Sequence, residues 1–146
     1  MSNFNRALSE AVAAEVRARL GRCWLNAALG LAWSDMASPL RHAEYVEGIC
    51  YHARGGPPHA HAWLELGGMI IDPTFTAVAV KKLRRPNREV ARRVREEWLR
   101  DIAAGTVDSY LGVERYSFAV VNAALLANRL PPFTPDLARL AVGVPP

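Results

Sequence analysis

Three residues of the chain have the types that a cysteine-dependent acyl-transfer site needs. Cys23 begins an apolar run, while His61 and Asp72 stand on either side of two glycines in HAWLELGGMIID, residues 61–72. A thiolate is a strong nucleophile, an imidazole exchanges a proton near neutral pH, and a carboxylate can hold that imidazole in one tautomer. If the fold brings the three side chains together, the chemistry would be attack on a carbonyl group through a thioester.

The position of Cys23 favours a nucleophile if the cysteine begins a helix. The segment CWLNAALGLAW, residues 23–33, is apolar almost all round, which is typical of a buried helix. Unpaired backbone N–H groups and the helix dipole at the start of such a helix stabilise a thiolate. The alternative is an inert core cysteine, because free cysteines are commonly buried.

A hairpin turn decides whether His61 and Asp72 share a face. Two glycines at residues 67–68, between apolar runs, are typical of a tight turn, and counting back from it places Trp63 opposite Asp72. Side chains alternate faces, so His61 and Asp72 would project as diagonal neighbours, whereas a one-residue change in the turn would separate them. The alternative is a partly exposed histidine and an aspartate that caps the DPT turn. The pattern alone leaves both interpretations open.

Three motifs stand in an order that resembles a known family. They are GRCWLNA, YVEG and HAWLELGGMIIDPT, and they fall between Gly21 and Phe75. This half of the chain resembles the core of the transglutaminase-like branch of the papain-like fold, which has a cysteine at a helix start, a HAW strand and an aspartate in a DPT strand end. The resemblance implies that Cys23 is the nucleophile, that His61 is the general base and acid, and that Asp72 orients His61.

The resemblance also implies a class of reaction and a fold. A short linker between Cys23 and His61 and the absence of accessory domains make the chain similar to small bacterial and phage-borne members, many of which are peptidases or amidases. The implied fold is a nucleophile helix packed on a small antiparallel sheet, and the implied substrate is a peptide or protein amide. His59, on the same face as His61, is the rival base; His61 is preferred because HAW starts there and because it lies nearer Asp72.

Four further residues are candidates for contact with the substrate. Trp24 and Trp63 could wall a cleft, and Tyr45 could line it, although large aromatic residues are more often part of a core. Asn26 lies one helical turn after Cys23 and is a candidate second oxyanion donor beside the N–H of Cys23. The alternative for Asn26 is a hydrogen-bonded core amide.

A competing interpretation is a zinc site. Cys50, His52, His59 and His61 form a C-x-H…H-x-H pattern on two expected neighbouring strands, and their ligand types suit zinc. The spacing matches no zinc signature, and a zinc site would leave Cys23 and the DPT segment unexplained. The preferred prediction is a site that uses neither a metal nor a cofactor.

The expected elements form one α+β domain over residues 1–146. Four-residue spacing of apolar residues predicts an amphipathic first helix, and an antiparallel sheet then separates this helix and the buried one from C-terminal helices. The expected helices are 4–20, 23–33, 88–103, 118–130 and 135–142, and the expected strands are 43–53, 59–66, 69–75 and a short one within 109–118.

Composition and charge exclude some classes of protein. The 146-residue chain has a net charge of +4 and two cysteines, too few for a disulfide framework. No apolar run reaches the length of a membrane span, and the N-terminus lacks the apolar stretch of a signal peptide, so a cytoplasmic protein without membrane contact is expected.

The segment KKLRRPNREVARRVREEWLR, residues 81–100, holds much of the positive charge. Glutamates among its arginines are typical of a solvated helix face, and no aromatic stacking pattern accompanies the charge, which argues against nucleic acid. The alternative is a non-catalytic binding module that uses this basic helix to contact an acidic partner.

Overall fold

The computed structural model describes residues 4–19, 22–32, 39–50, 59–74 and 110–135. Within these ranges the helices are α1 (Arg6–Val16), α2 (Cys23–Ala32), the 3-10 helix η1 (Pro39–His42) and α5 (Phe118–Leu126), and the strands are β1 (Glu44–Cys50), β2 (His59–Leu66), β3 (Met69–Ile71) and β4 (Tyr110–Tyr116). The described strands form one antiparallel sheet in the order β3-β2-β1-β4. The predicted α+β class is confirmed.

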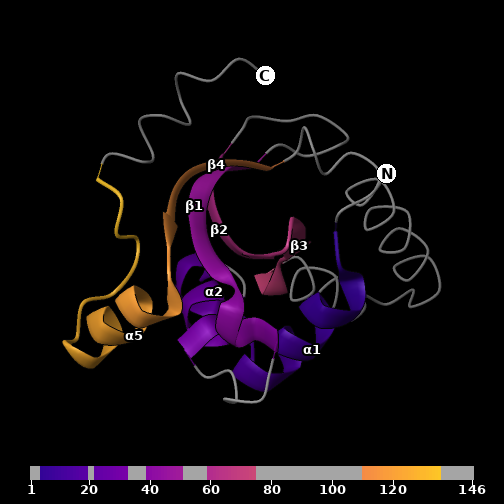
Figure 1. The fold of residues 1–146 in the computed structure, drawn as a ribbon, viewed down its shortest axis with the longest axis horizontal. Helices are drawn as coiled ribbons and strands as arrows, with labels where there is room; N and C mark the ends of the chain where they lie inside the picture. Colours follow the sequence, from indigo (N-terminus) through magenta and orange to yellow (C-terminus); the bar gives the residue numbers. More distant parts are fainter. Residues whose placement is uncertain (1–3, 20–21, 33–38, 51–58, 75–109, 136–146) are drawn as a thin grey trace, which may run out of the picture.

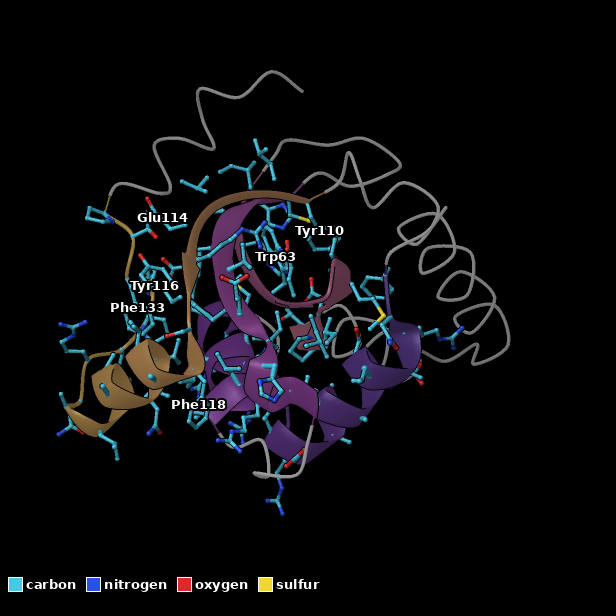
Figure 2. All side chains as sticks on the ribbon, in the orientation of Figure 1. Trp63, Tyr110, Glu114, Tyr116, Phe118 and Phe133 are labelled. Carbon is cyan, nitrogen blue, oxygen red and sulfur yellow. The ribbon has the colours of Figure 1, made fainter. Side chains whose placement is uncertain are left out.

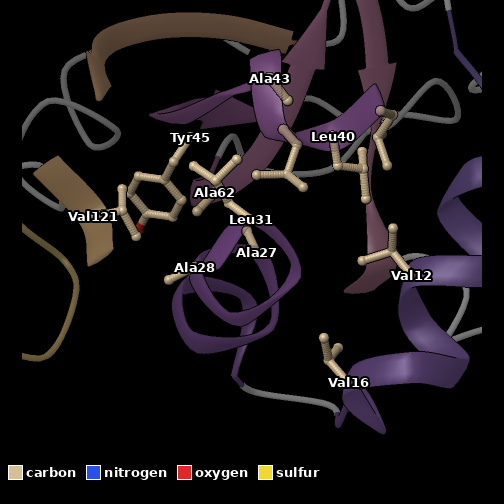
Figure 3. Close-up of a cluster of buried hydrophobic side chains, with 12 residues drawn as sticks. Val12, Val16, Ala27, Ala28, Leu31, Leu40, Ala43, Tyr45, Ala62 and Val121 are labelled. Carbon is tan, nitrogen blue, oxygen red and sulfur yellow. The ribbon is translucent and has the colours of Figure 1, made fainter. Parts of the chain in front are cut away.

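The sheet curls strongly (Figure 1). Its two faces carry separate hydrophobic clusters. One face packs on α1, α2 and α5 through the cluster of Figure 3, which contains Val12, Val16, Ala27, Ala28, Leu31, Leu40, Ala43, Tyr45, Ala62, Leu64, Ile71 and Val121. The other face holds a smaller cluster of Phe4, Val46, Cys50, Trp63, Ile70 and Tyr110, and Trp63 and Tyr110 lie together inside the curl (Figure 2). Both faces of the middle strands are therefore buried.

The first helix is shorter than the apolar spacing predicts. The side chain of Asn5 caps α1 by accepting a hydrogen bond from the N–H of Leu8, and Arg17 ends the helix with a left-handed φ of 53°. Phe4 belongs to the other cluster, because it forms a bridge to Ile70 of β3. The prediction of a helix over 4–20 was thus too long at both ends.

Helix α2 begins at Cys23, as predicted. The N–H of Asn26 donates to the carbonyl oxygen of Arg22 at 2.8 Å, which makes Arg22 the residue that precedes the first helical turn. Small residues let α1 and α2 approach closely, since a Cβ on Gly30 would lie 2.7 Å from Cγ1 of Val12. The buried face of α2 is therefore fixed against α1 at one side and the sheet at the other.

The hairpin between β2 and β3 has the register that the two glycines predict. Leu66 pairs with Met69, and Gly67 and Gly68 both adopt positive φ, at 56° and 80°. Strand β3 ends at Ile71, earlier than the predicted residue 75, because the chain turns at Asp72 and Pro73 has no N–H for the ladder.

A close approach of strands marks the other side of β1. Gly48 lies opposite Gly112 of β4, next to a register shift in the pairing, and a Cβ on Gly48 would lie 2.7 Å from Cη2 of Trp63 and would also clash with the backbone oxygen of Leu111. A Cβ on Gly112 would approach only side-chain atoms and no backbone, the nearest atom being Cγ1 of Val46 at 3.0 Å. Gly48 is thus the position where β1, β2 and β4 leave no room for a side chain.

The buried carboxylate of Glu47 fastens the chain after α5 to the sheet. It accepts hydrogen bonds from the hydroxyl of Tyr45 at 2.7 Å and from the backbone N–H groups of Phe133 and Thr134 at 2.7–3.0 Å. Burial, followed by the charge of Glu47, raises the pKa of Tyr45 far above its usual value. Figure 2 shows Phe133 beside Tyr116, on the outer side of the curl.

The C-terminal elements agree in part with the prediction. Strand β4 lies within the predicted segment 109–118, while α5 ends at Leu126, short of the predicted residue 130. Asn128, with a φ of 58°, turns the chain out of the helix before the prolines. The predicted helices 88–103 and 135–142 and the basic segment 81–100 fall outside the described residues. No helix of the described ranges is long and apolar enough to cross a membrane.

Candidate active site

Cys23 is the first residue of α2 and is partly exposed. The N–H groups of the first helical turn have no partner within the helix, and Arg22, which precedes the turn, has no side-chain acceptor with which to cap them. These N–H groups and the helix dipole favour negative charge at this end of α2. A thiolate on Cys23 and an oxyanion formed next to it would both benefit.

His61 and Asp72 form a hydrogen-bonded pair inside the curl of the sheet. Nε2 of His61 lies 2.6 Å from Oδ2 of Asp72, and the two residues are 4% and 0% exposed. The predicted register of the hairpin, which puts His61 and Asp72 on the same face of the sheet, is confirmed. The Cys23 thiol is a second hydrogen-bonding neighbour of the same imidazole. Both Asp72 and Cys23 therefore neighbour the imidazole of His61.

The electrostatics of the site favour a charged His61. Burial alone lowers the pKa of the imidazole, but the charge and hydrogen bond of Asp72, together with the hydrogen bond and charge of Cys23, outweigh it and raise the pKa to about 10. An imidazolium next to a cysteine stabilises the thiolate form. The ring of His61 also stacks on Trp63, with centroids 6.2 Å apart and planes 23° from parallel.

Asp72 is held by hydrogen bonds with three parts of the chain. Oδ2, the oxygen that contacts His61, also accepts a hydrogen bond from the hydroxyl of Tyr110 in β4 at 2.9 Å, and Oδ1 accepts one from the N–H of Thr74 at 3.0 Å. The N–H of Asp72 donates to Oγ of Ser9 in α1 at 2.9 Å. The carboxylate is therefore fixed in rotation as well as in place.

Sequence reasoning missed Ser9 and Tyr110. The DPT turn did indicate that Asp72 would cap its own turn, and the bond from Thr74 does this. Ser9 and Tyr110 lie 63 and 38 positions from Asp72, and a single buried serine or tyrosine carries no signal of such a distant partner. Only the curl of the sheet and the packing of α1 bring them to the carboxylate.

Asn26 does not have the role expected of a second oxyanion donor. Its Nδ2 donates to the carbonyl oxygen of Arg19 at 2.8 Å and to Oγ1 of Thr74 at 3.1 Å, and its Oδ1 accepts from the N–H of Arg19 at 3.1 Å. Both amide hydrogens are used, so none is left for a substrate oxygen. Asn26 instead joins the start of α2 to the chain after α1 and to the turn that carries Asp72.

Two of the three aromatic candidates, Tyr45 and Trp63, are core residues. Tyr45 and Trp63 have no exposed surface, so the expectation that they line a substrate cleft is wrong for this structure. Trp24 is half-buried against the cluster of Figure 3. The indole N–H of Trp63 donates to Glu65 at 3.0 Å, and its ring supports His61 from within the curl.

The three described residues of the zinc interpretation, Cys50, His59 and His61, do not form a metal-binding group. Cys50 and His59 pair directly across β1 and β2, while His61 is hydrogen-bonded to Asp72, and His52 falls outside the described residues. Among the described residues, no group of three or more His, Cys, Asp and Glu side chains could hold a metal ion. His59, the rival base, lies beside His61 with ring centroids 5.5 Å apart, and the carboxylate of Asp72 is on His61.

Comparisons of the chain with protein-family models, with curated proteins and with solved structures found no match. A partly exposed cysteine at a helix start, a buried imidazole beside it and a fixed carboxylate behind the imidazole have the chemical groups of a Cys-His-Asp triad.

Proposed function

We propose that the protein is a cysteine-dependent acyl-transfer enzyme with a transglutaminase-like, papain-like core, and that it acts on a peptide or protein amide. Cys23 is the nucleophile, His61 is the general base and acid, and Asp72 orients His61. The observation that supports the proposal is the hydrogen bond of His61 to Asp72, together with the Cys23 thiol as a further hydrogen-bonding neighbour of the imidazole. An isolated core cysteine would require neither the imidazole nor the buried acid.

The proposed reaction has two steps through a thioester. The thiolate of Cys23 attacks the carbonyl carbon of the amide, the C–N bond breaks, and the imidazolium of His61 gives its proton to the departing amine. His61 then takes a proton from water as the water attacks the thioester carbonyl; the C–S bond breaks, the acid product leaves, and the Cys23 thiolate and the His61 imidazolium are restored. An amine in place of water gives transamidation. The N–H of Cys23 and the dipole of α2 stabilise the oxyanion of each tetrahedral intermediate.

The first test is the reactivity of the two cysteines with iodoacetamide across pH, read by peptide mass spectrometry. Cys23 should be alkylated near neutral pH much faster than glutathione, because the thiolate is the reactive form and His61 stabilises it. Cys50 is the internal control: it is buried, and burial raises the pKa of its thiol well above the usual value, so it should stay unmodified in the folded protein. Alkylation of Cys23 no faster than that of glutathione contradicts the proposal.

The second test is acyl transfer itself, with p-nitrophenyl acetate as the probe. Wild-type protein should release nitrophenolate in a burst and carry a hydroxylamine-sensitive acetyl group on Cys23. Cys23→Ala should abolish the burst and His61→Gln should slow it at least about a hundredfold, the usual worth of general acid–base catalysis. Cys50→Ala is the matched control and should retain the burst. An acetyl group found elsewhere, or a burst that survives Cys23→Ala, overturns the assignment.

A further inference from the structure

Tyr110 and His61 hydrogen-bond to one and the same oxygen. The hydroxyl of Tyr110 donates to Oδ2 of Asp72 at 2.9 Å, and Nε2 of His61 lies 2.6 Å from that atom. Tyr110 is 8% exposed, and its ring packs edge-on against Trp63 with centroids 5.0 Å apart, so it has no freedom to turn away. The two donors come from β2 and β4, which lie on either side of β1.

Tyr110 holds its proton firmly. Burial, followed by the negative charge of Asp72, raises the pKa of the phenol well above its usual value, so Tyr110 remains a hydrogen-bond donor throughout the pH range of the folded protein. The titratable groups that face His61 or its carboxylate are Cys23 from α2, His59 on β2, Cys50 on β1, Asp72 after β3 and Tyr110 on β4. Among these described groups, Tyr110 is a neutral donor to Oδ2 of Asp72, the same oxygen that His61 contacts.

We propose that Tyr110 is a positioning residue of the site, which fixes the rotamer of Asp72 and weakens the hold of its Oδ2 on the His61 proton. A second donor on Oδ2 withdraws negative charge from the oxygen and places a positive hydrogen near the imidazolium. His61 consequently releases its proton to a leaving group more readily than it would beside an unshared carboxylate. This inference deepens the proposed function and rests on it for its catalytic meaning.

The test is the titration of the His61 imidazole, followed by long-range ¹H–¹⁵N NMR in the full chain. Tyr110→Phe removes the hydroxyl and keeps the ring, so the midpoint of His61 should rise by roughly one pH unit. A genetically encoded 3,5-difluorotyrosine at position 110 is a stronger donor and should lower the midpoint below that of the wild type. A residue that merely fills space would leave the midpoint unchanged in both variants.

Tyr116→Phe is the matched control. Tyr116 lies in the same strand and shares a hydrogen bond with Oγ1 of Thr134, so the change also removes one hydroxyl and one hydrogen bond but does not touch Asp72. In this variant the midpoint of His61 should stay within about 0.2 pH units of the wild type, because the lost hydrogen bond does not involve Asp72. Only the removal of a hydrogen bond to a titrating group of the site should move the pKa of His61.

The outcomes separate this inference from the proposed function. An unchanged His61 midpoint in folded Tyr110→Phe, or an equal shift in Tyr116→Phe, overturns the role of Tyr110. If Tyr110→Phe does not fold, the difluorotyrosine variant decides, and an unchanged midpoint there overturns the role. If the midpoint moves as expected while wild-type Cys23 accepts no acetyl group, the coupling of Tyr110 to His61 stands and the proposed acyl transfer fails.

Discussion

Replacement of Asp72 by asparagine should change His61 at neutral pH from a charged imidazolium to a mostly neutral imidazole. The pKa of His61 is raised from 6.5 to about 10 although burial acts to lower it, and Asp72 is the largest cause of the rise. The difference between these values corresponds to roughly 5 kcal/mol in favour of the imidazolium, at about 1.36 kcal/mol per pKa unit. Asparagine keeps a hydrogen-bond acceptor but removes the charge, and burial then dominates.

The expected pKa of His61 in Asp72→Asn is below 6.5. At pH 7 the wild-type imidazole is about 99.9% protonated, whereas that of the variant should be at least about three quarters neutral. The same NMR titration follows the change, and the resonances of His61 are assigned by their loss in His61→Gln. Without an imidazolium beside it, Cys23 should also react with iodoacetamide at pH 7 at least about tenfold more slowly.

The matched control for this charge change is Glu65→Gln. Glu65 lies on the same strand as His61 and pairs with Arg115 at the surface, so the variant removes one negative charge without touching the imidazole. The pKa of His61 should remain within about 0.3 of the wild-type value because the charge of Glu65 is partly exposed to solvent and already paired with Arg115. A His61 midpoint above about 9 in Asp72→Asn, or an equal shift in Glu65→Gln, would refute the reasoning.

Three further predictions concern the free energy of unfolding, measured by urea denaturation. Glu47→Ala should lower it by about 3 kcal/mol or more, because the buried hydroxyl of Tyr45 and two partly buried N–H groups lose their acceptor, and Glu47→Gln should cost less; equal costs contradict the reasoning. Gly48→Ala should cost about 3 kcal/mol and Gly112→Ala under about 1 kcal/mol, since only the first meets backbone atoms; the reverse order refutes the packing argument. In Cys23→Ala, the free energy should fall as pH rises above about 6.5, by up to about 1.4 kcal/mol per pH unit, because folded His61 keeps a proton that the unfolded chain releases. The stability that His61 contributes is complete below pH 6.5 and is lost as pH rises through its folded pKa, so an added His61→Gln change should flatten this dependence, and a slope that persists would contradict the linkage.

Local patterns were sufficient to predict the parts of the site that depend on local geometry. The apolar run after Cys23 predicted where α2 begins, and the two glycines at 67–68 predicted the register that puts His61 and Asp72 on one face. Both are properties of a few consecutive residues, helical burial in one case and turn geometry in the other. For this reason the helix start and the hairpin agree with the structure.

Predictions that depended on distant partners were weaker. Asn26 was a candidate oxyanion donor because of its place on the helix, but its amide is occupied by Arg19 and Thr74. Phe4 fitted the apolar stripe of α1, yet it pairs with Ile70 of β3. In each case the sequence placed the residue correctly along the chain, while the contact that decides its role comes from a segment with no local signature.

The curl of the sheet is what completes the candidate site. In a flat sheet of order β3-β2-β1-β4, the two edge strands would be three strand spacings apart, yet the hydroxyl of Tyr110 in β4 reaches Asp72, which directly follows β3. The facing glycines Gly48 and Gly112 lie beside a register shift in the pairing of β1 with β4, and bulges of this kind increase local twist. The environment of His61 is therefore set by the shape of the backbone across all four strands, and a substitution that flattens the sheet would separate Tyr110 from Asp72 without altering any residue of the proposed triad.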